Sequence, residues 1–170
     1  VQCGMGRTGR WFGFEHCGIC PDLITLGKGL TSSVPVSAVV GRADVLDLPN
    51  PGEMSSTHGG NPVGVAAALA ALDVIEQEEL LAASSTTGNQ VLARLQALQA
   101  VYPERILSAH GRGLFLSLHF MQAGTRAPDV NLADAVACEA VRRGVLMFVT
   151  GRGFIKFVPP LSIDPDAAME

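Results

Sequence analysis

The sequence is poor in lysine, in aromatic side chains and in charge. Charged residues make up 16% of its 170 positions and aromatic residues 5%, and only two of the 12 basic residues are lysines, Lys28 and Lys156. Because the net charge is −4, there is no basic field to attract nucleic acid or an anionic membrane, and few rings are present on which bases could stack. Any chemistry that needs a lysine therefore has two candidates.

Two further absences narrow the class of protein. No uncharged apolar run reaches the roughly 18 residues that a membrane span needs. Four cysteines among 170 residues do not form the dense pattern of a secreted disulfide scaffold. Since 48% of the residues are hydrophobic, the chain is not a disordered tail either. We expect a globular protein of the reducing cytoplasm.

The hydrophobic pattern predicts an α/β fold in two parts. We expect strands at residues 22–26, 35–40, 106–107, 114–120, 145–149 and 154–158, and helices at residues 61–79, 89–99 and 132–143. The first two strands are nearly continuous in apolar residues, which favours a sheet covered on both faces. An acidic run at 76–79 ends the first apolar pattern, so we divide the chain into a piece of a larger α/β domain (1–80) and a small α+β domain (81–170).

Two short motifs near the N-terminus have plain structural interpretations. Residues 4–9, GMGRTG, match the dinucleotide fingerprint GxGxxG, but no amphipathic helix follows them, so we interpret them as a glycine-rich turn. Cys17 and Cys20 form a CxxC pair with Cys3 upstream, whereas a structural zinc ion usually takes four ligands from paired motifs. We expect structural cysteines and no metal, with a zinc-binding domain that uses these three thiols as a remote alternative.

Two other segments could carry chemistry. Lys28 follows an apolar strand and lies between Gly27 and Gly29, where an amine can act as a nucleophile toward carbonyls and a flat cofactor can approach closely. Residues 55–62, SSTHGGNP, combine hydroxyl groups and glycines with a helix N-terminus, which are the parts of a phosphate or carboxylate site. Taken alone, an ordinary turn lysine and a well-capped helix start explain the two segments equally well or better.

Taken together, several segments resemble the class III (omega-amino-acid) aminotransferases, which are pyridoxal-phosphate enzymes of fold type I. The resemblance covers essentially the whole chain and rests on VQCGMGRTGRWFGFEHCGICPDLITLGKGL (1–30), SSTHGGNP (55–62), GRGLFLSLHF (111–120) and FIKFVPPL (154–161). It implies that residues 1–80 are the C-terminal part of the cofactor-binding large domain, with the catalytic lysine strand and the phosphate-loop helix. Residues 81–170 would be the small C-terminal α+β domain, truncated at its end.

The resemblance assigns roles to three residues of the first part. Lys28 would form the internal aldimine with pyridoxal phosphate and then move the proton between substrate Cα and cofactor C4′. Thr57 would bind the cofactor phosphate, typically that of the neighbouring subunit, so a homodimer with shared active sites is implied. Gln2 matches the end of the family's D-E-V-Q run and would contact the cofactor near its phenolic oxygen.

Lys156 marks a departure from the family. Many members carry an arginine there that grips the substrate's α-carboxylate, and a lysine lacks the planar bidentate fork. Lys156 would then bind a carboxylate as a point charge, or the substrate would be a diamine or aminosugar without that carboxylate. An equally simple alternative is that its stem only packs on a strand.

The implied reaction is transamination between a primary, often terminal, amine and a 2-oxo acid or aldehyde. Other class III chemistry (aminomutase, racemase or decarboxylase) and a catalytically inactive module with the same fold remain alternatives. The family's Asp that keeps the pyridine nitrogen protonated would precede Val1, so we expect these residues to be a C-terminal fragment without activity alone. The implied partners are small molecules and a second subunit, with no nucleic acid and no membrane.

Overall fold

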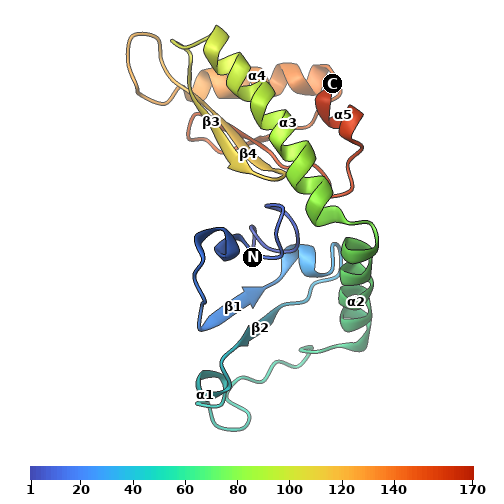
Figure 1. The fold of residues 1–170 in the computed structure, drawn as a ribbon. Helices are drawn as coiled ribbons and strands as arrows, with labels where there is room; N and C mark the ends of the chain where they lie inside the picture. The colour runs from blue at the N-terminus through green and yellow to red at the C-terminus, as the bar shows by residue number, and fades with distance from the viewer. The chain divides into compact units, whose positions relative to one another are not determined.

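A computed structural model describes all 170 residues, and the chain divides into two compact units, Val1–Leu81 and Ala82–Glu170 (Figure 1). The first unit contains η1 (Gly13–Cys17), β1 (Leu23–Leu26), η2 (Lys28–Leu30), β2 (Ala38–Gly41), α1 (Ala43–Leu46) and α2 (Pro62–Gln77). The second contains most of α3 (Leu80–Val101), then β3 (Ile106–Arg112), β4 (Phe115–Phe120), α4 (Val130–Arg142), β5 (Phe148–Val149), β6 (Phe154–Phe157) and α5 (Pro165–Met169).

The first unit is built around a two-stranded antiparallel ribbon. Strand β1 pairs with β2 from Leu23 opposite Gly41 to Leu26 opposite Ala38. Val39 and Val40 of β2 are 43% and 51% exposed, so these residues do not test the expectation of a sheet covered on both faces. The apolar sequence is that of a fully covered strand, but only two strands of such a sheet lie within these residues.

Helix α2 begins where the sequence predicts. Asn61 is the N-cap and accepts a hydrogen bond from the Gly64 amide at 2.7 Å, and Pro62 occupies the first helical position. A Cβ atom on Gly64 would lie 2.1 Å from Cγ2 of Val36, so the first turn of α2 packs directly on the segment that leads into β2. The same helix contacts η2, which carries Lys28.

The second unit is a four-stranded antiparallel sheet in the order β3-β4-β6-β5, with one face packed against helices. The core joins sheet residues to α4, with Leu95 of α3 packed against it; its buried members are Ile106, Ala109, Leu118, Phe120, Ala133, Ala137 and Ile155. Side chains alternate along β4, so Leu116, Leu118 and Phe120 point into this core. No helix of the chain has both the length and the apolar character to cross a membrane.

Helix α3 is longer than the sequence predicts. The sequence predicts a start at residue 89, from the spacing of the apolar residues that follow it. In the structure the helix already begins at Leu80, and the small polar residues of its first half pack against the rest of the second unit. The buried Ser84 hydroxyl accepts a hydrogen bond from the Leu114 amide at 3.2 Å. A Cβ on Gly88 would lie 2.1 Å from the carbonyl oxygen of Gly113, so α3 lies directly against the β3–β4 turn.

The short elements differ from the sequence prediction in smaller ways. Strand β3 runs to Arg112 rather than ending after two residues, because it pairs with β4 along its length. Strand β5 has only two residues, Phe148 and Val149, and the preceding residues 145–147 are irregular. The helix expected at 132–143 is α4, which begins two residues earlier, with Asp129 as its N-cap.

Candidate functional site

Lys28 lies on a tight turn at the end of β1. It is the first residue of the 3₁₀ turn η2, in which the Leu30 amide donates a hydrogen bond to the carbonyl oxygen of Gly27 at 3.1 Å. Leu30 is buried and anchors the turn, whereas the Lys28 side chain is exposed and makes no ion pair. The backbone of Lys28 is therefore held in a hydrogen-bonded turn, while its primary amine is exposed to solvent.

The backbone of this turn is strained, and the strain is local. Lys28 has φ 49°, in the left-handed region that side-chain-bearing residues rarely adopt. Only three other non-glycine residues have positive φ: Met5, Ser32 and Glu79. Two of them belong to the same neighbourhood, because Ser32 follows the turn and Met5 packs against Gly29. Strain of this kind costs about 1–3 kcal/mol per residue and clusters at functional sites.

The glycines that flank Lys28 are not required by the packing of the chain. A Cβ on Gly27 would lie 3.7 Å from the carbonyl oxygen of Val36, and one on Gly29 would lie 3.5 Å from Cβ of Met5. Both are ordinary contact distances, and neither glycine has the positive φ that demands glycine. Neither glycine is therefore explained by a close contact within the chain, and both keep the backbone beside Lys28 free of side-chain bulk, as expected if a flat molecule approaches the turn.

The N-terminal segment supports the Lys28 turn. Met5 is buried against Gly29, and Cγ1 of Val1 lies 3.9 Å from the Cβ position of Gly27. The structure therefore places the backbone that carries Gln2 beside the Lys28 turn, with the Gln2 side chain exposed. The GMGRTG segment consists of turns, as predicted, and no helix of dinucleotide-binding type follows it.

Thr57 lies on the loop before α2. The loop is a series of turns, in one of which the Gly59 amide donates a hydrogen bond to the carbonyl oxygen of Ser56 at 3.0 Å. Thr57 is exposed and its hydroxyl makes no hydrogen bond. It precedes a 16-residue helix, whose N-terminal amides and dipole favour an anion. Thr57 is thus an exposed residue on the loop before a helix N-terminus, and the structure shows no contact between Thr57 and Lys28.

The four cysteines are free and exposed. Cys17 ends η1 and Cys20 lies in the following loop, while the Cys3 Cβ lies 2.8 Å from the Cβ position of Gly13. No group of three His, Cys, Asp or Glu residues in the chain is arranged to hold a metal ion.

Lys156 belongs to the second unit, on the sheet face opposite the helices. It is in the middle strand β6, opposite Ser117 of β4 and Phe148 of β5. Its Nζ lies 5.4 Å from the ring centroid of Phe148 and 6.0 Å from that of Phe115. Lys156 makes no ion pair, so two aromatic rings are the partners of its ammonium group.

A stack of three rings lies on the same sheet face, and sequence reasoning did not predict it. The His119 ring lies 4.8 Å from the His110 ring and 4.4 Å from the Phe154 ring, all nearly parallel, and His119 Nε2 is 3.2 Å from the Ser117 hydroxyl. The pKa of His119 is lowered mainly by partial burial and, to a smaller extent, by the charge of the nearby His110. The stack depends on the register of β3, β4 and β6, which no local pattern shows.

Comparison with known proteins gives consistent matches for the chain as a whole. The family model for aminotransferase class III matches residues 1–170. The 4-aminobutyrate aminotransferase of Mycobacterium leprae is 37% identical over 172 residues, covering 100% of this chain and 38% of that protein. The acetylornithine aminotransferase of Elizabethkingia anophelis has a similar structure, with a TM-score of 0.90 and 32% identity over 99% of this chain and 41% of that one.

A third similar structure is that of an amine transaminase from an uncultivated Pseudomonas species in its PLP-bound form. Its TM-score is 0.89, with 31% identity over 98% of this chain and 40% of that one. The chain thus spans about two fifths of the length of the relatives it matches. Its fold is that of the C-terminal part of a PLP-dependent aminotransferase of mixed α/β architecture.

Proposed function

Because this chain belongs to the class III aminotransferases, we propose that the protein it represents transfers an amino group between a primary, often terminal, amine and a 2-oxo acid or aldehyde. The observation that carries the proposal is the Lys28 turn. An exposed amine without an ion-pair partner stands on a backbone in the rare left-handed conformation, and a buried methionine supports the turn. The chain keeps this arrangement at the cost of backbone strain.

The residues around Lys28 fit pyridoxal phosphate as the cofactor. Gly27 and Gly29 leave the backbone beside Lys28 without side chains, which suits a flat ring, and the Lys28 amine is the one group here that can bond an aldehyde carbon. When bound, the cofactor supplies an electron sink that makes the Cα–H bond of an amine acidic. The Gln2 amide, on the adjacent segment, is the group of this chain proposed to hydrogen-bond the ring's phenolic oxygen.

We assign the proton transfer to Lys28. With the cofactor bound, the Lys28 amine would be the base that takes the proton from substrate Cα and delivers it at C4′. The exposure of the side chain gives the amine the freedom that such a movement needs. No His, Asp or Glu within residues 26–34 offers an alternative base.

Thr57 is proposed to bind the cofactor phosphate of a second subunit. Its unpaired hydroxyl and the N-terminus of α2 offer donors for a dianion, while nothing in the chain joins Thr57 to its own Lys28. This division of the donors supports a homodimer in which each active site uses residues of both subunits. The substrates would be small-molecule amines and oxo compounds.

Lys156 is proposed to bind a substrate carboxylate as a point charge. Its ammonium group has no acidic partner, and the Phe115 and Phe148 rings restrict its position without neutralising its charge. This supports a carboxylate-bearing substrate over a diamine, because an unpaired cation between rings disfavours a second cation nearby.

Replacement of Lys28 in the full-length protein tests the proposal. Lys28→Ala removes both the nucleophile and the base, so turnover of an amine-donor panel with 2-oxo acids should fall by at least roughly 10²–10⁴-fold. Added methylamine should restore part of the proton transfer to Lys28→Ala but leave the wild type unchanged. Arg10→Ala, at an exposed position of the same unit, is the control and should retain turnover.

Three outcomes would contradict the proposal. Retained turnover in Lys28→Ala would reject the role of the lysine. Racemised, isomerised or decarboxylated products from the wild type would show another class III reaction. A correctly folded wild-type dimer that binds the cofactor but converts no donor would show a catalytically inactive module.

A further inference from the structure

The second unit has a surface hollow between α3 and the edge strand β3. Its volume is about 470 Å³, within the range of small-molecule sites. The lining residues that matter here are Gln96, Gln99, Ile106, Leu107, Met121 and Arg126. None of them belongs to the Lys28 turn, the Thr57 loop or the sheet face that carries Lys156.

One wall of the hollow is fixed by Gln99. Its side-chain amide nitrogen donates a hydrogen bond to the carbonyl oxygen of Leu107 at 3.1 Å, and its amide oxygen accepts one from the backbone amide of Ala109 at 3.2 Å. These are backbone groups of β3, which has a neighbouring strand on one side only. Because both ends of the Gln99 amide are used, the spacing between α3 and β3 is set by the protein alone.

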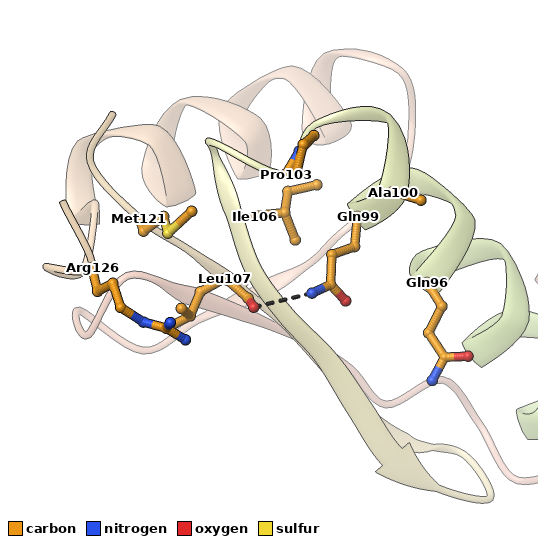
Figure 2. Close-up of a pocket in the computed structure, with 8 residues that line it drawn as sticks. All are labelled: Gln96, Gln99, Ala100, Pro103, Ile106, Leu107, Met121 and Arg126. Atoms are coloured by element: carbon orange, nitrogen blue, oxygen red, sulfur yellow. Dashed lines mark hydrogen bonds between the residues drawn. The ribbon is translucent and has the colours of Figure 1, made fainter. Parts of the chain in front are cut away.

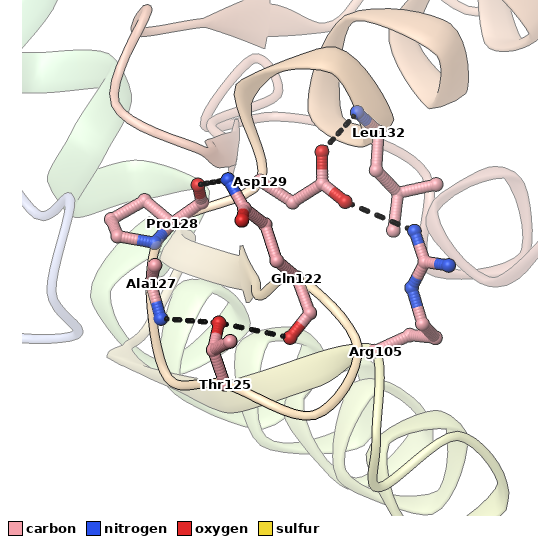
Figure 3. A network of polar contacts seen from close by, with 7 residues as sticks. All are labelled: Arg105, Gln122, Thr125, Ala127, Pro128, Asp129 and Leu132. Atoms are coloured by element: carbon pink, nitrogen blue, oxygen red, sulfur yellow. Dashed lines mark hydrogen bonds and ion pairs between the residues drawn. The ribbon is translucent and has the colours of Figure 1, made fainter.

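The loop that carries Arg126 is also held in place. The Thr125 hydroxyl donates to the carbonyl oxygen of Gln122 at 3.3 Å and accepts from the Ala127 amide at 3.1 Å (Figure 3). At the end of the loop, Asp129 pairs with Arg105 at 3.0 Å and caps α4. Arg126 therefore extends from an ordered loop.

Two polar side chains of the hollow have no partner in the protein. The Arg126 guanidinium makes no ion pair or hydrogen bond, and neither does the Gln96 amide. Figure 2 shows the two side chains at opposite ends of the hollow, with Leu107 and Ile106 between them. The floor is apolar, since Ile106 is 5% exposed and Met121 is partly buried.

We propose that this hollow binds a short aliphatic carboxylate. The carboxylate would pair with Arg126, whose planar guanidinium matches it in a bidentate manner. The apolar chain would lie over Ile106 and Leu107, and a polar group at the far end would meet the Gln96 amide, which can both donate and accept. A cationic ligand of the same length would meet Arg126 with like charge.

Ligand-observed saturation-transfer NMR on the full-length protein tests this, with hexanoate as the probe and hexylamine as its charge-reversed control. Hexanoate should bind at millimolar concentration, with saturation transferred along its methylene chain. Hexylamine is a primary amine that the proposed Lys28 site can also take, so the expected result is that its binding does not depend on Arg126. Arg126→Gln should weaken hexanoate binding about fivefold to tenfold, and Arg126→Lys should recover part of it. Arg152→Gln, an exposed arginine of the same unit, is the matched control and should change nothing.

The variants also separate this site from the proposed substrate site. Lys156→Met should leave Arg126-dependent hexanoate binding unchanged even if it impairs turnover. Gln96→Leu should leave hexanoate binding unchanged but weaken binding of 6-hydroxyhexanoate. The proposal is wrong if hexylamine binding depends on Arg126 as hexanoate binding does, or if Arg126→Gln, with an unaltered melting temperature, binds hexanoate as the wild type does.

Discussion

The two lysines of this chain are held in place by different means. Lys28 stands on an irregular turn with a left-handed backbone, and its side chain has no partner. Lys156 stands on a regular strand in the middle of a sheet, and two aromatic rings flank its ammonium group. The first amine is positioned by its backbone and is free to move, whereas the second is positioned by neighbouring side chains.

This difference matches the chemistry proposed for each residue. An amine that must bond to a cofactor and then carry a proton needs a fixed origin and a mobile end, which a strained turn provides. A cation that only binds an anionic group loses less side-chain entropy on binding if neighbouring rings already restrict its position. Backbone changes should therefore affect the Lys28 turn, and changes in packing and charge should affect the sheet.

Among the changes that affect folding stability, the largest expected effect comes from a substitution that pushes α3 away from the β3–β4 turn of the sheet. Gly88→Ala places a Cβ 2.1 Å from the Gly113 carbonyl oxygen, and because this contact is with backbone, α3 must move away from the β3–β4 turn. We expect a loss of about 1–3 kcal/mol in the free energy of unfolding, measured by urea denaturation. Thr86→Ala, at an exposed position of the same helix, should be neutral or slightly stabilising because alanine favours helix. Equal stability of Gly88→Ala and Thr86→Ala would show that the close contact is not formed.

Removing the charge of Lys156 should have the next largest effect. Lys156→Met keeps the length of the side chain and its contacts with Phe115 and Phe148 but removes the cation. For a donor with a carboxylate we expect kcat/KM of the full-length protein to fall about tenfold, which corresponds to roughly 1.4 kcal/mol.

Two controls give this test its meaning. A diamine donor without a carboxylate should react with Lys156→Met as well as with the wild type, and Lys156→Arg should retain carboxylate-bearing donors. If Lys156→Met affects both donors alike, or neither, the lysine only packs its stem on the strand.

The sequence predicted regular elements well where their signals were local. Helix α2 has its cap at Asn61 and its proline at the first position, so its start was predicted correctly and its end within two residues. The start of α3 was wrong because Ser84 and Gly88 form long-range contacts with the β3–β4 turn. Their identities alone indicate a loop, and only the tertiary partner changes that.

For the candidate site too, residue types could be predicted from the sequence, whereas the contacts between distant segments could not. The prediction of Lys28 as the site lysine rested on its flanking glycines together with the family resemblance, and it stays a prediction. Its left-handed backbone belongs to a turn that contacts Met5 and α2, and no local sequence pattern shows these contacts. The aromatic partners of Lys156 come from strands far apart in the sequence. Residue types are visible in a sequence, while the register that brings them together is not.

A smaller effect should distinguish the backbone of the Lys28 turn from an ordinary one. At most positions glycine is less stable than alanine by about 0.5–1 kcal/mol, because it has more freedom in the unfolded chain. At φ 49° the order should reverse, since alanine retains the left-handed strain and glycine does not. We expect Lys28→Gly to be about 1 kcal/mol more stable than Lys28→Ala in urea denaturation, with both variants inactive. The usual order, with alanine the more stable, would show that the turn is relaxed in solution.

The smallest effect should come from the ring stack on the Lys156 face of the sheet. Burial and the neighbouring His110 lower the pKa of His119, so the unfolded chain binds a proton more readily than the folded one. Stability supplied by neutral His119 is thus present above its unfolded pKa of about 6.5 and is lost as the pH falls through that value toward the lower folded pKa. Because the ring is only partly buried, solvent screens the interaction and keeps the effect on stability small.

This pH dependence has a specific signature, because the groups around His119 are basic or neutral. His110 stacks on one side and Phe154 on the other, Ser117 lies within hydrogen-bonding distance, and Lys156 shares the face. His119→Gln should therefore lose less stability than the wild type between pH 7.5 and pH 5.5, as measured by the urea midpoint at each pH. His110→Gln should give a smaller change of the same sign, since the charge of His110 contributes less than burial does. If His119→Gln loses as much stability as the wild type between pH 7.5 and pH 5.5, protonation of His119 does not contribute to the acid sensitivity of the protein.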